Sequence, residues 1–452
     1  MTAQAGLCGY EQKEEKYRME TWTPSAAIYA GSLARTYEYR TTGVPTTPQI
    51  RWSFALKPGA RITCPILVLQ DRVYIADSAG YLTALDAPSG DLVWSFPTDW
   101  VEDPKKTLSF ESRGVSAFCL DGALGYVASA RDTLYELDLH TGQVLRSWAH
   151  LDDEEDADVF FDVEQIEALF IHHGVLFLIG TSDLSGYGTY RFDRRTGVLS
   201  ADPIEIDQNE CDCAPTVYRD PKSRSDLIFG YHMFNNSGDT LFGAIGLSGT
   251  HPDDPISYLW HTNGLNKDHN PHDLFRTLGY LSYCNVPLLD GTLYVFSENM
   301  WDTLPEWAGM PSVGPFIIPG LDKEFAALLA LEPDTGTVKW SYQYSYGCAP
   351  IQMAAASHLV FLVSSNQIEA IDVQTHQPCW NWKAAFPVRH ALVADGLLYV
   401  LGAQGEITTL EVSTGAMRWI WQVEGEILKD WSTIDKGTLF IATPHALYAL
   451  SS

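Results

Sequence analysis

A strand–turn–strand unit that recurs along most of the chain constrains its fold more than any other feature. Residues 84–94, "ALDAPSGDLVW", alternate like a strand, turn at a glycine and continue into a second strand that carries a tryptophan, and 330–340 and 409–419 repeat the pattern. The turn glycines are Gly90, Gly142, Gly197, Gly249, Gly336 and Gly415, with His376 in the equivalent position of "AIDVQTHQPCW". The steps between these positions are 52, 55, 52, 87, 40 and 39 residues. Repeats of this length made of short strands are typical of β-propellers.

The long step of 87 residues contains one further strand pair, "VPLLDGTLYVFS" at 286–297. We therefore interpret the excess as insertions at about 262–275 and 299–325. The innermost strands are then expected to start near residues 62, 114, 165, 213, 283, 349, 389 and 431. The sequence predicts an all-β fold, an eight-bladed β-propeller of four-stranded antiparallel blades.

The last unit of the repeat is incomplete. The chain ends at 445–452, "HALYALSS", before any turn or tryptophan, whereas residues 49–56, "QIRWSFAL", place Trp52 where other units carry theirs. We predict that the strand at about 49–56 pairs with the C-terminal blade and closes the ring, because an unpaired strand edge invites association. Residues 49–452 then form one propeller, and residues 1–48, which include "TTGVPTTP", form an N-terminal arm or linker.

Composition excludes several classes of partner. The chain has 29 basic and 57 acidic residues and a net charge of −28. Such a charge repels nucleic acid and anionic membranes, so we expect neither as a partner. The first twenty residues have no apolar core of a secretory signal, which predicts a cytoplasmic protein. Eight scattered cysteines predict free thiols rather than a disulfide framework.

The repeat resembles the blade motif of the pyrroloquinoline-quinone-like repeat family over about residues 49–452. That family includes quinoprotein dehydrogenases and cofactor-free propellers such as an outer-membrane assembly scaffold. In the dehydrogenases the quinone lies against a disulfide of adjacent cysteines, with Ca²⁺ beside it. Here "ECDCAP" separates Cys211 from Cys213 by Asp212, so we expect no quinone and no other cofactor.

Several conspicuous residues are expected to be structural. The repeat tryptophans should pack each outer strand against the next blade, since large rings fill the wedge between twisted sheets; they are Trp52, Trp94, Trp260, Trp340, Trp380 and Trp419. The acidic stretch 152–158 and the histidine-containing stretch 268–273 are expected to be solvated loops, although the sequence leaves metal binding by either open.

Candidate functional residues lie where the innermost strands begin, because these starts surround the mouth of a propeller's central channel. Substrate-binding candidates are Arg61, Arg113, Arg389, Lys429, Asn285, Trp431 and Trp301. Candidates for proton transfer are His390, Glu167, Tyr283 and Asp212. Cations on one side of the mouth and carboxylates with a phenol on the other would suit a small, anionic or polarised organic molecule. The alternative is that these charges pair and plug the channel.

This arrangement is compatible with two main functions and with a third, less favoured one. The first is a small-molecule site at the channel mouth, with cofactor-independent cyclase, lyase or isomerase chemistry and the insertion at 299–325 as a lid. The second is a non-catalytic scaffold that binds a protein on one face, with the same insertion as a partner-binding loop. A quinone-dependent dehydrogenase is the third and least favoured function.

Overall fold

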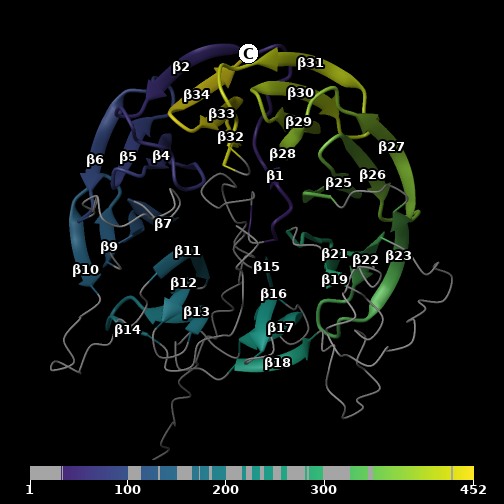
Figure 1. Cartoon of the computed structure of the whole chain (residues 1–452), viewed down its shortest axis with the longest axis horizontal. Helices are drawn as coiled ribbons and strands as arrows, with labels where there is room; N and C mark the ends of the chain where they lie inside the picture. The colour runs from purple at the N-terminus through teal and green to yellow at the C-terminus, as the bar shows by residue number, and fades with distance from the viewer. Residues whose placement is uncertain are drawn as a thin grey trace, which may run out of the picture.

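The computed structural model describes most of the repeat region. The described residues are 32, 34–99, 114–130, 133–149, 165–172, 174–182, 186–199, 216–219, 226–234, 239–247, 256–261, 280–281, 285–298, 326–344, 350–428 and 431–452. Their regular elements are all β-strands, which form eight separate sheets arranged radially about a central axis, as in a β-propeller (Figure 1). None of the described residues belongs to a helix long and apolar enough to cross a bilayer.

The sheets are numbered 1 to 8 in the chain order of their innermost strands, and the later strands of each sheet follow outward from the axis (Figure 1). In sheet 8 the outermost strand comes from the start of the repeat region. Sheet 1 contains β3 (Leu67–Leu69), β4 (Arg72–Ala76), β5 (Tyr81–Asp86) and β6 (Leu92–Pro97), and sheet 2 contains β7 (Val115–Asp121), β8 (Leu124–Ser129), β9 (Thr133–Asp138) and β10 (Val144–Ala149). Sheet 3 contains β11 (Gln165–His172), β12 (Val175–Ser182), β13 (Gly186–Asp193) and β14 (Val198–Leu199). Sheet 4 contains β15 (Thr216–Arg219), β16 (Asp226–Phe234), β17 (Asp239–Leu247) and β18 (Ile256–His261).

Sheets 5 to 8 follow the same plan, with additions from the N-terminal arm. Sheet 5 contains β19 (Tyr280–Leu281), β20 (Leu288–Leu289), β21 (Thr292–Glu298), β22 (Ala326–Leu331) and β23 (Val338–Tyr344), and sheet 6 contains β24 (Gln352–Ala356), β25 (Leu359–Val363), β26 (Gln367–Asp372) and β27 (Gln377–Lys383). Sheet 7 contains β1 (Glu38–Tyr39), β28 (Val388–Ala394), β29 (Leu397–Gly402), β30 (Glu406–Glu411) and β31 (Met417–Gln422). Sheet 8 contains β2 (Gln49–Ala55), β32 (Thr433–Asp435), β33 (Thr438–Thr443) and β34 (Ala446–Ser451).

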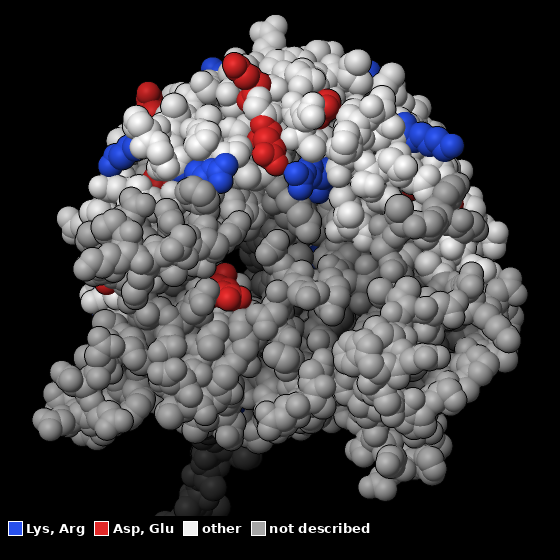
Figure 2. Space-filling model, in the orientation of Figure 1, with Lys and Arg blue, Asp and Glu red and all other residues white. Residues whose placement is uncertain are grey.

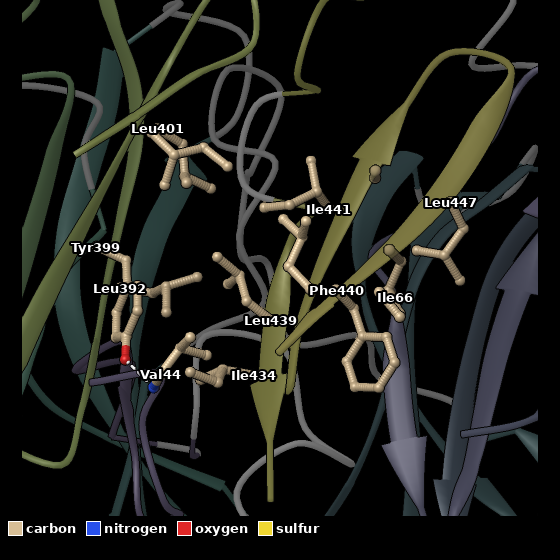
Figure 3. Close-up of a cluster of buried hydrophobic side chains, with 14 of the residues drawn as sticks. Val44, Ile66, Leu392, Tyr399, Leu401, Ile434, Leu439, Phe440, Ile441 and Leu447 are labelled. Atoms are coloured by element: carbon tan, nitrogen blue, oxygen red, sulfur yellow. Dashed lines mark hydrogen bonds between the residues drawn. The ribbon is translucent and has the colours of Figure 1, made fainter. Parts of the chain in front are cut away.

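The predicted pairing of the two ends of the repeat region is confirmed. Strand β2 lies antiparallel to β34, in a register that runs from Gln49 opposite Ser451 to Ala55 opposite Ala446. The sheet that they share packs its apolar face into the largest buried cluster of the described residues, in which Phe440 and Leu447 lie close to side chains of sheet 1 (Figure 3).

The tryptophans of the outer strands join neighbouring sheets, as the sequence predicts. The indole Nε1 of Trp52 donates to the carbonyl of Ala87 in sheet 1 at 2.9 Å, and Trp94 donates to Leu139 in sheet 2 at 3.0 Å. The turn glycine belongs to the same contact. Gly90 has φ +77°, and a Cβ there would lie 2.5 Å from the ring of Trp52.

One non-glycine residue occupies this turn position. His376 has φ +60°, a left-handed conformation that is uncommon outside glycine. Its ring stacks on Trp340 of the preceding sheet, with centroids 4.5 Å apart and planes 18° apart. The imidazole therefore fills the space that a glycine would leave beside the tryptophan.

The described part of the N-terminal arm, residues 34–48, is built into the sheets. Carbonyl oxygens of the arm accept backbone hydrogen bonds from sheets 5, 6, 7 and 8, in the pairs Leu288–Ala34, Ala355–Thr36, Val393–Tyr37 and Gly437–Thr42, at 2.8 to 2.9 Å. Strand β1 also pairs in parallel with β28. The arm therefore ties four consecutive sheets together rather than acting as a free linker.

Val44 of the arm compensates for the turn that sheet 8 lacks. Its carbonyl accepts the indole N–H of Trp419 at 3.0 Å, as turn carbonyls do for the other tryptophans. Its N–H donates to the hydroxyl of Tyr399 at 2.5 Å, an interaction drawn in Figure 3. Burial raises the pKa of Tyr399, so its hydroxyl stays protonated within the core.

Candidate functional site

The two faces of the disc differ in what the innermost strands present there. We call the face on which these strands begin the leading face, and the face on which they turn back into the second strand the hairpin face. The predicted site belongs to the leading face. Five predicted residues, Arg113, Asp212, Tyr283, Trp301 and Lys429, lie outside the described residues, as do the insertions at 262–275 and 299–325 and the loops at 152–158 and 268–273.

Three predicted side chains come from neighbouring sheets on the leading face. Arg389 at the start of β28 is exposed and forms an ion pair with Glu426, with 3.1 Å between Nη2 and Oε1. Arg61 and Trp431 are partly buried and precede β3 and β32. Both are also held by their backbones, since Arg61 N–H donates to Ser78 and the Trp431 carbonyl accepts from Ile66.

Figure 2 shows basic and acidic side chains of the described residues interspersed beside a central hollow on the face it presents. Glu167, a further predicted residue, is exposed on β11, which lies across the axis from β28 and β32 (Figure 1). The leading face thus combines cations, carboxylates and an indole around the axis. Such a surface suits a charged ligand or a polar protein surface.

His390 does not reach this surface. It follows exposed Arg389, which is the extra residue of a β-bulge in the pairing of β28 with β29, and it is fully buried, with 0% exposure. Its ring packs edge-on against Tyr37 of the arm, with centroids 5.2 Å apart and planes 71° apart. The predicted proton-transfer role would require the arm to move, because a substrate cannot reach an imidazole with no exposed surface.

Asn285 is also buried, and its amide is engaged by the backbone. Its Nδ2 donates to the carbonyls of Arg35 at 3.1 Å and Met353 at 2.5 Å, and its Oδ1 accepts the N–H of Met353 at 2.8 Å. A predicted substrate-binding residue thus joins sheet 5 to sheet 6 and to the arm.

Similar contacts join other innermost strands, and the sequence analysis missed them. The amide of Gln352 exchanges two hydrogen bonds with the backbone of Ala391, at 2.7 and 2.8 Å, across sheets 6 and 7. The hydroxyl of Thr63 donates to Val115 at 2.7 Å across sheets 1 and 2. The sequence does carry a signal for these contacts, namely a hydrogen-bonding side chain in or just before an otherwise apolar innermost strand.

The sequence model of one protein family matches most of the well-described repeats. This family, described as outer membrane protein assembly factor BamB, matches residues 43–199 and 324–451, which is more than half of the chain. The chain belongs to the BamB family. The predicted resemblance to pyrroloquinoline-quinone-like repeat propellers is thereby confirmed.

Solved structures place this BamB-family chain among propellers of more than one activity. It resembles BamB from Moraxella catarrhalis at 12% identity and a TM-score of 0.57, over 90% of this chain and 100% of that one. It resembles the quinohemoprotein alcohol dehydrogenase of Comamonas testosteroni at 11% identity and a TM-score of 0.59, over 95% of this chain and 80% of that one. At these identities the likeness shows the fold alone. No curated protein sequence matches the chain.

The described cysteines of this BamB-family chain do not fit the quinone site of the dehydrogenases. Cys64 and Cys119 are buried on different sheets, Cys379 is exposed, and all three are free thiols. Burial raises the pKa of Cys64 to about 12 and raises that of Cys119 as well. Cys211 and Cys213 lie outside the described residues. Within the described ranges, no three His, Cys, Asp or Glu side chains are grouped closely enough to share a metal ion.

The hairpin face carries a second set of charges, which hold the arm. Thr41 donates to Asp435 Oδ1 at 3.3 Å, and the next residue, Lys436, forms an ion pair with Asp71 of sheet 1. Burial raises the pKa of Asp435, and the nearby Lys436 ammonium opposes that rise. The hydrogen bond to Asp71 raises the pKa of Lys436. These side chains connect sheet 8, sheet 1 and the arm.

Proposed function

We propose that this BamB-family chain is a non-catalytic scaffold that binds a protein partner. In this proposal the eight sheets are the blades of a single propeller, and the pairing of β2 with β34 closes the ring. A closed ring of interlocked sheets presents broad, rigid surfaces, and a rigid surface loses little conformational entropy when a partner binds.

The observation that carries this proposal is that polar side chains of the innermost strands are buried or bonded to neighbouring strands. His390 is buried beneath the arm, and the amide of Asn285 bonds to the backbone of sheet 6. Gln352 and Thr63 likewise bond to neighbouring strands. These side chains hold sheets together, and catalysis would need such groups to face a substrate. The matching family is also named for an assembly factor.

A second candidate function is the binding of a small organic anion at the leading face. Arg61, Arg389 and Trp431, from three neighbouring sheets, favour it, because guanidinium groups and an indole suit an anionic, partly apolar ligand. Cyclase, lyase or isomerase chemistry finds less support, since among its proposed proton-transfer residues His390 is buried. Cytoplasmic location remains a prediction that cell fractionation tests.

Native mass spectrometry of the chain isolated from its own cells distinguishes these functions. The scaffold predicts a stoichiometric protein adduct and no small-molecule adduct. The matched variant is Arg61→Ala with Arg389→Ala, which removes both guanidinium groups of the leading face. A small-molecule adduct that disappears in this variant would replace the scaffold by the second candidate.

A further inference from the structure

The outer strands share a β-bulge, and the fold does not dictate which type of residue occupies it. In seven sheets the pairing register shifts by one residue at a β-bulge. The extra residue has no partner opposite it on the neighbouring strand, and it directly precedes the tryptophan in each strand except β10. These bulge residues are Arg51, Val93, Leu145, Leu259, Lys339, Cys379 and Arg418.

Two neighbouring sheets place aliphatic side chains at this position. Val93 in β6 is 41% exposed and Leu145 in β10 is 51% exposed, and the residues before them, Leu92 and Val144, are 58% and 44% exposed. We call these four residues the sheet 1–2 rim. The strands β6 and β10 lie next to each other on the perimeter (Figure 1), and Trp94 bonds β6 to sheet 2.

Other sheets show that the repeat does not require this apolar surface. Lys339 occupies the bulge of β23 and pairs with Glu332 at 3.2 Å, and Arg418 occupies that of β31 and pairs with Glu411. Charged residues at these positions protect outer strands from association. The sheet 1–2 rim carries no charge at its two bulges, and a group of exposed aliphatic side chains on adjacent outer strands marks an interaction site.

The border of the rim is predominantly acidic. Asp86 ends β5, Asp91 directly precedes β6, and Asp138 ends β9. Hydrogen bonds from the backbone and side chain of Thr141 lower the pKa of Asp138, which keeps it ionised. The cations nearby are engaged, since Arg72 donates to the carbonyl of Leu139 and Arg146 pairs with Glu136.

The geometry points to a helix rather than a strand as the occupant. The bulge at Val93, in the pairing of β6 with β5, bends and twists the strand whose other edge is free, and Pro97 at the end of β6 has no N–H to donate. An added strand would therefore find a poor backbone template. An anionic lipid surface would be repelled by the carboxylates on the border.

We propose that the sheet 1–2 rim binds an amphipathic helix of a protein partner. The aliphatic face of that helix packs on Leu92, Val93, Val144 and Leu145, and lysine or arginine side chains beside that face lie near Asp91 and Asp138. This rests on the proposed scaffold function and assigns it one surface and one class of partner. The recognition mode is that of a helix lying on an apolar surface.

The test uses a fluorescent peptide of about 18 residues, or five helical turns, with leucine and lysine at helical spacing. The rim variant is Val93→Arg with Leu145→Lys, which copies residue types that other bulges already carry. The matched control is Ile420→Arg with Met417→Lys, the same change in charge at exposed aliphatic residues of β31. We expect the rim variant to bind the peptide about tenfold more weakly, and the control to bind like the wild type.

Equal weakening in both variants, or in neither, overturns the proposal, because binding then depends on overall charge or lies elsewhere. Tighter binding of a peptide in which leucine and lysine alternate overturns it too, since alternation favours a strand. If the rim variant does not fold, Leu92→Ser with Val144→Ser tests the same surface without added charge. A protein adduct that persists in rim variants would refute the rim while leaving the scaffold function intact.

Discussion

The hairpin face and the leading face of this disc use similar residue types for different purposes. On the hairpin face, Tyr37 of the arm is buried among side chains of sheets 6 and 7, and Asp435 and Lys436 contact the arm and sheet 1. On the leading face, Arg389 is exposed and pairs only at the surface with Glu426. Polar groups beneath the arm are withdrawn from water, while the exposed charged groups of the leading face remain available to a partner.

The difference arises from where the arm runs. Its carbonyl groups accept hydrogen bonds near the hairpin ends of four innermost strands, so side chains there are removed from water. Buried polar groups contribute to stability only when they are paired. We therefore expect the loss of packing or of hydrogen bonds beneath the arm to lower stability, and the loss of a buried charge there to raise it. Substitutions of exposed residues on the leading face should change binding, and the following predictions test that contrast.

The largest effect is expected for Tyr37→Ala. Tyr37 is 1% exposed and packs among sheets 6 and 7 and against His390, so its removal leaves a cavity. We expect the free energy of unfolding to fall by about 3 kcal/mol in chemical denaturation. Trp431→Ala on the leading face is the control, and it should cost about half as much because Trp431 is only partly buried. Equal losses would contradict the contrast between the faces.

A smaller loss is expected for Asn285→Ala. The substitution removes three hydrogen bonds and leaves the N–H of Met353 and two carbonyls without their partner. We expect the free energy of unfolding to fall by about 2 kcal/mol. Gln404→Ala, at an exposed side chain, should stay within about 0.5 kcal/mol of the wild type. Unchanged stability in Asn285→Ala would return this residue to the list of ligand-binding candidates.

Asp435→Asn should reveal the cost of burying a charge on the hairpin face. Because burial raises the pKa of Asp435, the folded state binds its proton more tightly than the unfolded state does. The ionised carboxylate therefore lowers stability as the pH rises through the folded-state pKa. The variant should be more stable than the wild type at pH 7, by less than about 1 kcal/mol, and this gain should vanish near pH 4. A gain that is constant with pH would rule out a charge effect.

The smallest effect on stability is expected for Arg389→Ala. Its ion pair with Glu426 is exposed, and exposed pairs contribute about 0.5 kcal/mol or less. Thermal unfolding should hardly change, whereas any ligand bound at the leading face should dissociate faster. A loss of more than about 1 kcal/mol would mean that this arginine holds the ring together as hairpin-face residues do.

The repeat itself could be predicted from local chemistry. A glycine before a strand with tryptophan signals a turn with positive φ, and Gly90 against Trp52 shows why both are needed. The pairing of residues 49–56 with the C-terminal strand followed from counting strands. The burial of His390 and Asn285 could not be predicted in this way, because it depends on an arm from the other end of the chain.

The sequence by itself determined the strand repeat and the propeller class, since the repeat depends on alternation and turn residues within a few positions. Counting the strands of the repeat then indicated the pairing of β2 with β34. Only the tertiary structure decided which polar residues are functional candidates. Arg389 and His390 are consecutive on β28, yet the first is exposed and the second is buried, because their exposure depends on segments distant in sequence. The described part of the arm packs Tyr37 against His390, whereas Arg389 stays exposed to water.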